Sequence, residues 1–171
     1  MKTVAVLVGA ALIGALPAAT AAPNDQSKQD QAFVDEAARG GKMEVDLGRL
    51  AEQNASDAKV KQFGARMVQD HTRLNSELGA VAKSIGLIIP TALSADQLAE
   101  YAKLSKLSGP KFDKAYMDLM VSDHAGDLAA FQKEEAATQD PKLKRAIAKA
   151  IPIIQEHLNM AKSDSTKLTA G

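Results

Sequence analysis

Apolar residues recur at helical spacing along most of this chain. From Val60, alternating steps of four and three residues reach Gly64, Met67, His71, Leu74, Leu78, Val81 and Ile85. This spacing places side chains on one face of an α-helix. Every position except His71 is apolar or glycine. The pattern therefore predicts a long amphipathic helix with a histidine on its buried face.

The same pattern predicts four long helices and a short one. We expect the long helices at about residues 31–54, 57–84, 110–138 and 141–163, with the short helix at about 94–107. Ser94 and Gln97 form a capping-box sequence at the start of the short helix. The link between the first two long helices is short, so these two should be antiparallel neighbours. The expected fold is all-α, an antiparallel four-helix bundle with a short extra helix between the second and third long helices.

The first 21 residues predict export. A basic start is followed by an apolar run and by the A-x-A pattern of Ala19-Thr20-Ala21, which indicates a signal peptide over residues 1–21. A retained membrane anchor is the alternative, but the run is short and contains Pro17. We expect residues 22–30 to be a flexible leader, 31–163 the bundle and 164–171 a polar tail. No membrane span is expected after cleavage.

Charge and motifs exclude several classes of protein. Without residues 1–21, which carry one lysine, 20 basic and 21 acidic side chains remain. This balance gives no electrostatic case for binding nucleic acid or an anionic membrane. The chain has no cysteine, hence no disulfide or thiolate chemistry. It also lacks a glycine-rich phosphate loop and a G-x-S-x-G motif, so no catalytic activity is indicated.

Polar residues on the predicted buried faces are the candidate site. The three histidines, His71, His124 and His157, fall on apolar stripes of three different long helices, and Glu44 takes such a position on the fourth. At 1.5 Å per residue their heights along the bundle agree within roughly two turns. A transition-metal ion, zinc, iron or copper, would satisfy all four groups in a dry core. A hydrogen-bonded His–Glu network without a metal explains the same pattern.

Other residues near these positions are additional candidates. Asp127, three residues after His124, is a possible extra ligand or a surface ion-pair partner. Met67, Met120 and Met160 lie within one turn of a histidine, where thioethers would suit Cu(I), although methionine also fills gaps in cores.

An acidic residue precedes each histidine directly: Asp70, Asp123 and Glu156. One position is about 100° around a helix. These carboxylates could orient a neighbouring histidine, but the spacing favours charges that face solvent.

Four segments carry a family resemblance. They are FVDEAARGGKMEVDLGRLA, VKQFGARMVQDHTRLN, FDKAYMDLMVSDHAGDLAAFQKE and LKRAIAKAIPIIQEHLNMA. Over about residues 31–163 the chain resembles a family of small exported bacterial proteins, a domain of unknown function often labelled predicted outer-membrane protein. The resemblance implies a ferritin-like bundle and brings no established activity. Val68, Val121 and Ile154 stand where ferritin-like di-iron enzymes have the glutamate of Glu-x-x-His, so ferroxidase chemistry does not carry over.

Two hypotheses follow. The first is an exported bundle, periplasmic or associated with the outer membrane, that binds one transition-metal ion in metal handling or envelope stress. The second is a structural or interaction module without a cofactor, in which the buried His/Glu layer sets only helix packing. The sequence names no protein partner for either.

Overall fold

Five helices make up residues 25–169, the part of the chain that this computed structural model describes. They are α1 (Asp25–Asn54), α2 (Ala58–Ser84), α3 (Ala95–Leu104), α4 (Gly109–Ala137) and α5 (Pro141–Thr169). Within these residues there is no strand, which confirms the all-α prediction. The predicted signal peptide, residues 1–21, lies outside the described residues.

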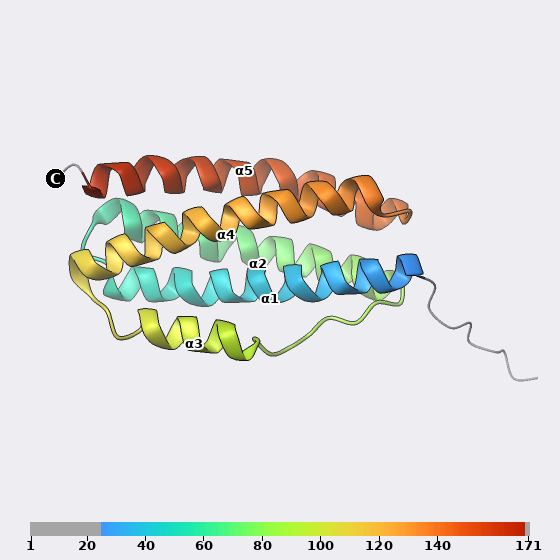
Figure 1. The fold of residues 1–171 in the computed structure, drawn as a ribbon, viewed down its shortest axis with the longest axis horizontal. Coiled ribbons are helices and arrows are strands. Elements are labelled where there is room, and N and C mark those ends of the chain that lie inside the picture. Colours follow the sequence, from blue (N-terminus) through green and yellow to red (C-terminus); the bar gives the residue numbers. More distant parts are fainter. Residues whose placement is uncertain (1–24, 170–171) are drawn as a thin grey trace, which may run out of the picture.

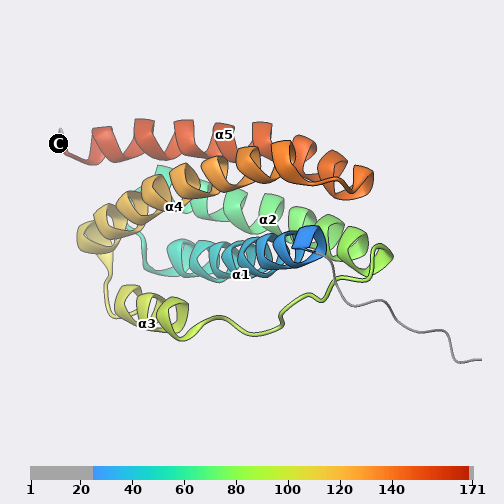
Figure 2. The same ribbon diagram turned by 45° about the vertical axis from the view of Figure 1, so that its right-hand side comes forward.

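The four long helices pack as two antiparallel hairpins, α1 with α2 and α4 with α5. The hairpins meet through α2 against α5 and α1 against α4 (Figure 1). The connection over residues 85–108 returns along the bundle, so α4 runs in the same direction as α2. The short helix α3 lies on the outside of the bundle, against α1 and α4 (Figure 2). This long connection decides the helix directions that sequence periodicity leaves open.

Local signals in the sequence fix several helix ends. The side chain of Asp57 accepts hydrogen bonds from two backbone N–H groups in the first turn of α2. Ser94 and Gln97 form the predicted reciprocal capping box at the start of α3. Gly86, just beyond α2, has a φ of 80°, a left-handed conformation that glycine adopts without steric cost. These ends are where the sequence predicts them.

The first helix begins earlier than the sequence predicts. α1 starts at Asp25, within the stretch expected to be a flexible leader. Gln29 donates a hydrogen bond to Glu134 of α4 at 2.9 Å, and Asp30 is buried. These contacts attach a polar segment without apolar periodicity to the neighbouring helix.

The last helix extends through residues 164–169, which the sequence predicts as a polar tail. Leu168 packs against the apolar core at this end of the bundle. Ser165 donates a hydrogen bond to Asp118 of α4 at 3.2 Å. Packing on α4 thus accounts for the extra turn and a half of helix.

The apolar core is divided along the bundle axis. One cluster contains Phe63 and Tyr116, and the other contains Phe33 and Leu143. On α2, α4 and α5 the histidine falls between the positions that contribute to the two clusters, whereas Glu44 of α1 lies at the edge of the first cluster, next to Met43. The division therefore leaves a polar layer near the middle of the bundle.

Two glycines, Gly48 of α1 and Gly64 of α2, face each other where these helices pack. A Cβ atom added to Gly64 would lie 2.7 Å from the carbonyl oxygen of Gly48, and the reverse distance is 2.6 Å. Such distances are too short for any side chain. The absence of side chains at both positions sets how closely the two helices approach near the histidine layer.

We expect Glu134→Gln to stabilise the protein at neutral pH by about 1 kcal/mol, the typical cost of a buried unpaired polar atom. Glu134 is buried, and its Oε1 has no hydrogen-bond partner among the described residues. Burial, and next the neighbouring Asp30, raise the pKa of Glu134. A raised carboxyl pKa means that stability falls as the pH rises from the unfolded pKa through the folded one.

Urea unfolding at pH 4 and pH 8 checks this expectation. The gain from Glu134→Gln should be larger at pH 8. Glu135→Gln, one position along α4, removes the same charge and should change stability by less than about 0.5 kcal/mol. An equal gain for Glu134→Gln at both pH values would contradict the prediction.

Candidate metal centre

The long helices α2, α4 and α5 bring His71, His124 and His157 together, and Glu44 of α1 lies beside them, 2.8 Å from His71 and 3.4 Å from His124. None of these four residues is more than 4% exposed. The imidazole centroids are 5.2 Å apart for His71 and His157, 5.4 Å for His124 and His157, and 5.6 Å for His71 and His124. The common level that helix spacing predicts is therefore present in the fold.

Each imidazole uses one nitrogen in a hydrogen bond to an acceptor. Carboxylate and carbonyl oxygens can only accept here, so in each case the ring N–H donates. The three bonds are His71 Nδ1 to Glu44 Oε2 at 2.8 Å, His124 Nδ1 to the Met120 carbonyl at 3.0 Å, and His157 Nε2 to Asp70 Oδ2 at 3.0 Å. These bonds fix the orientation of each ring.

The other nitrogen of each ring faces the shared interior. One nitrogen from each of the three histidines lies within 4.8 Å of one from each of the others. His71 Nε2 and His157 Nδ1 are 3.3 Å apart. Two ligands at about 2.0–2.1 Å in tetrahedral zinc sites are separated by roughly 3.4 Å. The pair at 3.3 Å thus has the spacing of two ligands on one zinc ion, and the third histidine nitrogen lies within 4.8 Å of both.

Two atoms beside this point are buried and lack a hydrogen bond among the described residues, His124 Nε2 and Glu44 Oε1. They lie 3.4 Å from each other. Unpaired buried polar atoms are costly, and a native protein rarely keeps them without a ligand or an internal water. A cation at this point would satisfy both atoms.

Burial and neighbouring charges shift the pKa values of the groups in this layer in different directions. Burial alone would raise the pKa of Glu44, but His71 and His124 lower it to about 2. Burial opposes a charge on His71 as well, yet Glu44 raises the pKa of that imidazole. Burial lowers the pKa of His124, and it lowers that of His157 to about 4. At neutral pH this arrangement leaves neutral imidazoles on α4 and α5, the form that binds metals.

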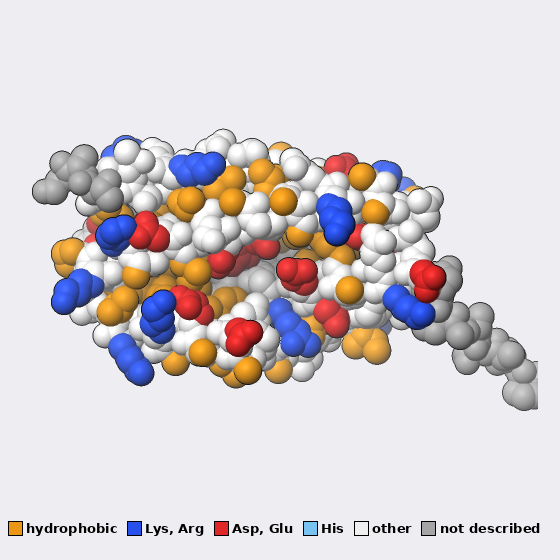
Figure 3. Space-filling model, viewed as in Figure 1, with side chains coloured by type: hydrophobic (Ala, Val, Ile, Leu, Met, Phe, Trp, Pro, Cys, Tyr) orange, Lys and Arg blue, Asp and Glu red, His pale blue; other side chains and the backbone are white. Residues whose placement is uncertain are grey.

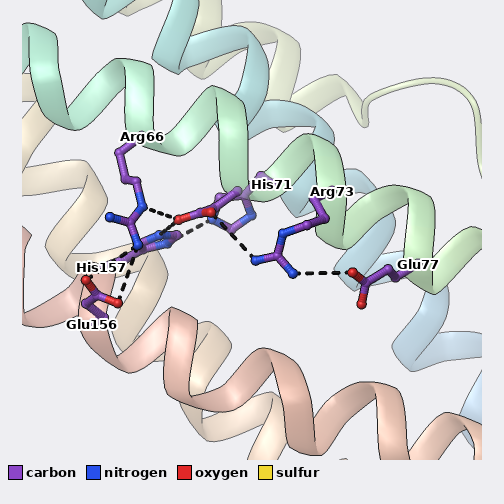
Figure 4. A network of polar contacts seen from close by, with 7 residues as sticks. Arg66, His71, Arg73, Glu77, Glu156 and His157 are labelled. Atoms are coloured by element: carbon purple, nitrogen blue, oxygen red, sulfur yellow. Dashed lines mark hydrogen bonds and ion pairs between the residues drawn. The ribbon is translucent and has the colours of Figure 1, made fainter.

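On the α2 side the layer is closed by a polar network (Figure 4). Arg66 donates to Asp70, and its guanidinium also lies 3.5 Å from the carboxylate of Glu156 on α5. Arg73 is 3.6 Å from Asp70 and 3.3 Å from Glu77. Two arginines therefore stand behind the carboxylate that orients His157.

The interpretation of Asp70 as a solvent-facing charge is wrong. Asp70 is only 6% exposed. Burial would raise its pKa, but the hydrogen bonds from Arg66 and His157 hold that pKa below its ordinary value. Because α5 packs against this side of α2, a residue one position from His71 meets the histidine of another helix. The Asp70-His71 pair is the feature of the sequence that indicates this role of Asp70.

The other two acidic neighbours behave differently. Glu156 is exposed, as predicted. Asp123 is half-buried, and burial together with Glu44 raises its pKa to about 6.

Asp127 lines a cavity of about 40 Å³ beside Glu44 and His71. Burial, and then Glu44, raise the pKa of Asp127 to about 8. Asp127 is thus close to the centre, and no described contact makes it a surface ion pair.

The three candidate methionines lie in the core. Met67 and Met120 are fully buried in the apolar cluster of Phe63 and Tyr116, and Met160 packs partly buried against it. This placement agrees with a role in packing.

The chain belongs to a family described as a domain of unknown function (DUF4142), whose model matches residues 15–163. The resemblance read from the sequence is confirmed at this level. The fold is similar to the crystal structure of a DUF305 fragment from Deinococcus radiodurans, with a TM-score of 0.71 and 16% identity over 81% of this chain and 96% of that one. At this identity the likeness concerns the fold alone. No curated protein matches the chain.

Between residues 25 and 169, no helix has both the length and the apolar character needed to cross a membrane.

Proposed function

We propose that this protein binds one transition-metal ion in the core of its bundle. The ligands would be His71 Nε2, His124 Nε2 and His157 Nδ1. Glu44 lies outside this group of three and would orient His71 by accepting the hydrogen bond from its Nδ1. The observation that carries the proposal is the convergence of three imidazole nitrogens whose partner nitrogens are each held by an acceptor. Metal-bound histidines commonly have this arrangement, because the second hydrogen bond fixes the tautomer and the ring orientation.

The donor set indicates the class of metal. Three neutral imidazoles beside one carboxylate suit zinc, iron or copper. A site of this kind binds a single ion, since no Glu-x-x-His motif supplies the bridging carboxylates of a di-iron centre. We therefore propose storage, delivery or sensing of a metal rather than oxygen chemistry.

We further propose that the protein acts outside the cytoplasm, in the periplasm or at the outer membrane, in metal handling or envelope stress. The signal-peptide pattern of residues 1–21 supports export. A ferritin-like architecture is part of this proposal. The single long connection between α2 and α4 supports it, since ferritin-like bundles contain one such connection.

A structural module without a cofactor is the second candidate. It is favoured by the 3.3 Å contact between His71 Nε2 and His157 Nδ1. With His71 protonated, an unbroken chain of hydrogen bonds runs from Glu44 through His71 and His157 to Asp70 without any metal. This layer would then fix helix register, and function would lie on the outer surface.

Metal binding distinguishes the two candidates. The metal-free protein, incubated with Zn²⁺ or Co²⁺ and dialysed, should retain one ion per chain by elemental analysis. Free metal at 1,000 times its Kd should stabilise the fold by about 4 kcal/mol, which raises the Tm by roughly 10 °C. His124→Ala should lose both the ion and the metal-dependent shift in Tm.

The control is the double variant Met67→Leu and Met120→Leu, which nearly conserves core volume and should keep the ion. Loss of the ion in this variant would indicate that the thioethers of Met67 and Met120 bind the ion. If the wild-type protein retains no metal and a chelator leaves its Tm unchanged, the structural module is the better account.

A further inference from the structure

An acidic groove lies on the face of the bundle formed by α1, α3 and α4. Its volume is about 480 Å³. Figure 3 shows acidic side chains gathered in a hollow near the middle of this face. Six carboxylates line the groove and, among the described residues that form it, there is no lysine or arginine. They are Glu36, Glu44, Asp96, Glu100, Asp123 and Asp127.

The groove reaches the histidine layer through Glu44. This side chain is 3% exposed, so it lies at the floor of the groove. Its Oε2 accepts the hydrogen bond from His71, whereas its Oε1 has no hydrogen-bond partner within residues 25–169 and lies 3.4 Å from His124 Nε2. A buried oxygen without a partner, at the junction of an acidic groove and a cluster of imidazoles, indicates a place for a cation.

Asp127 lies at the same junction. It lines both the groove and the small cavity beside His71, as Glu44 does. Two carboxylates from different helices, α1 and α4, therefore separate the groove from the imidazoles. An ion that leaves the groove would pass between oxygen donors before it meets nitrogen donors.

On the opposite side of the layer the carboxylates are paired with arginines, Arg66 with Asp70 and Glu156, and Arg73 with Asp70 and Glu77. Arg66 and Arg73 bind Asp70 behind His157, so a cation approaching from that side would meet two guanidinium groups. Clefts lined by one sign of charge raise the local concentration of the counter-ion and its association rate. The groove, whose described lining residues include six carboxylates and no lysine or arginine, thus favours the approach of a cation.

We propose that the acidic groove is the route by which a divalent cation reaches the histidine centre. This inference rests on the proposed metal binding. Carboxylates near the mouth, such as Glu36 and Glu100, attract the hydrated ion. Glu44, at the floor, then presents an oxygen to the ion within reach of His124.

Stopped-flow mixing of the metal-free full-length protein with Co²⁺, followed by the absorption of the bound ion, tests this route. In the triple variant Glu36→Gln, Glu100→Gln and Asp123→Asn, the association rate constant should fall tenfold or more at low ionic strength. Bound cobalt should remain at one ion per chain. The steep decrease of the wild-type rate with added salt should be largely lost in the variant.

The matched control carries Asp25→Asn, Glu52→Gln and Asp118→Asn, which change the net charge equally at exposed positions outside the groove. Its rate should remain within twofold of the wild-type rate. Equal rates for the two triple variants would overturn the route while leaving the metal centre in place. If the wild-type protein binds no cobalt, zinc or copper, both the route and the proposed function fail.

Discussion

Replacing Glu44 by alanine is expected to lower the free energy of unfolding of the metal-free protein by about 3–5 kcal/mol, the usual effect of removing one partner from a buried ion pair. The lowered pKa of Glu44, about 2, and the raised pKa of His71 both favour the charged form of this pair. Both side chains are buried, and Nδ1 and Oε2 are 2.8 Å apart. The alanine variant would leave a buried imidazolium unpaired or force it to lose its proton.

Urea unfolding at pH 7 in the presence of a chelator measures this effect. Glu44→Gln, which keeps an oxygen acceptor and nearly the same volume, should cost less than half as much as the alanine substitution. The contribution of a carboxyl with a lowered pKa is present above its unfolded pKa and is lost as the pH falls through the folded one. The difference between wild type and Glu44→Ala should therefore narrow between about pH 4.5 and pH 2. Equal losses in the alanine and glutamine variants would show that the charge of Glu44 has no role in stability.

Gly64→Ala is expected to destabilise the protein by about 2–3 kcal/mol through overpacking. The added methyl group would lie 2.7 Å from the carbonyl oxygen of Gly48 and 2.8 Å from Cβ of Ala51. A backbone carbonyl inside α1 cannot turn aside as a flexible side chain can. The helices must therefore separate, which also disturbs the layer that His71 and Glu44 share.

Gly79→Ala is the matched control, because it makes the same substitution in the same helix. Apart from its chain neighbours and its own helix backbone, no atom of the described residues lies within 4 Å of a Cβ placed there. This variant should gain about 0.5–1 kcal/mol, since alanine is a better helix former than glycine. Thermal or urea unfolding of both variants gives the comparison. A gain in stability for Gly64→Ala would mean that α1 and α2 do not approach as closely as described.

The predictable parts of this protein are those that depend on neighbours in sequence. The 3.6-residue period of apolar residues predicts the long helices, and the capping residues Asp57 and Ser94 mark helix starts to within a residue or two. The helices at the chain ends were predicted too short. The segments 25–30 and 164–169 are polar and show no apolar period, and they are attached by contacts to α4 that no local pattern records.

The candidate site also has residues that the sequence predicts and others that only the fold identifies. Glu44, His71, His124 and His157 can be found from the sequence because each interrupts an apolar stripe, and an interrupted stripe is visible without a structure. Asp70 could not be assigned, since its role depends on how α5 packs against α2. The acidic groove is also invisible in the sequence, because its residues come from three helices and the carboxylates are far apart along the chain.

The helical class, the helix positions and the four polar residues on buried faces can be read from the sequence, because each of these follows from the periodicity of a single helix. The direction of α4, the hydrogen bond that holds each imidazole and the convergence of the three histidines depend on the fold. These features depend on the rotation and spacing of helices relative to one another. The contact of Gly48 with Gly64 and the long connection between α2 and α4 set those quantities, and no periodicity within one helix contains them.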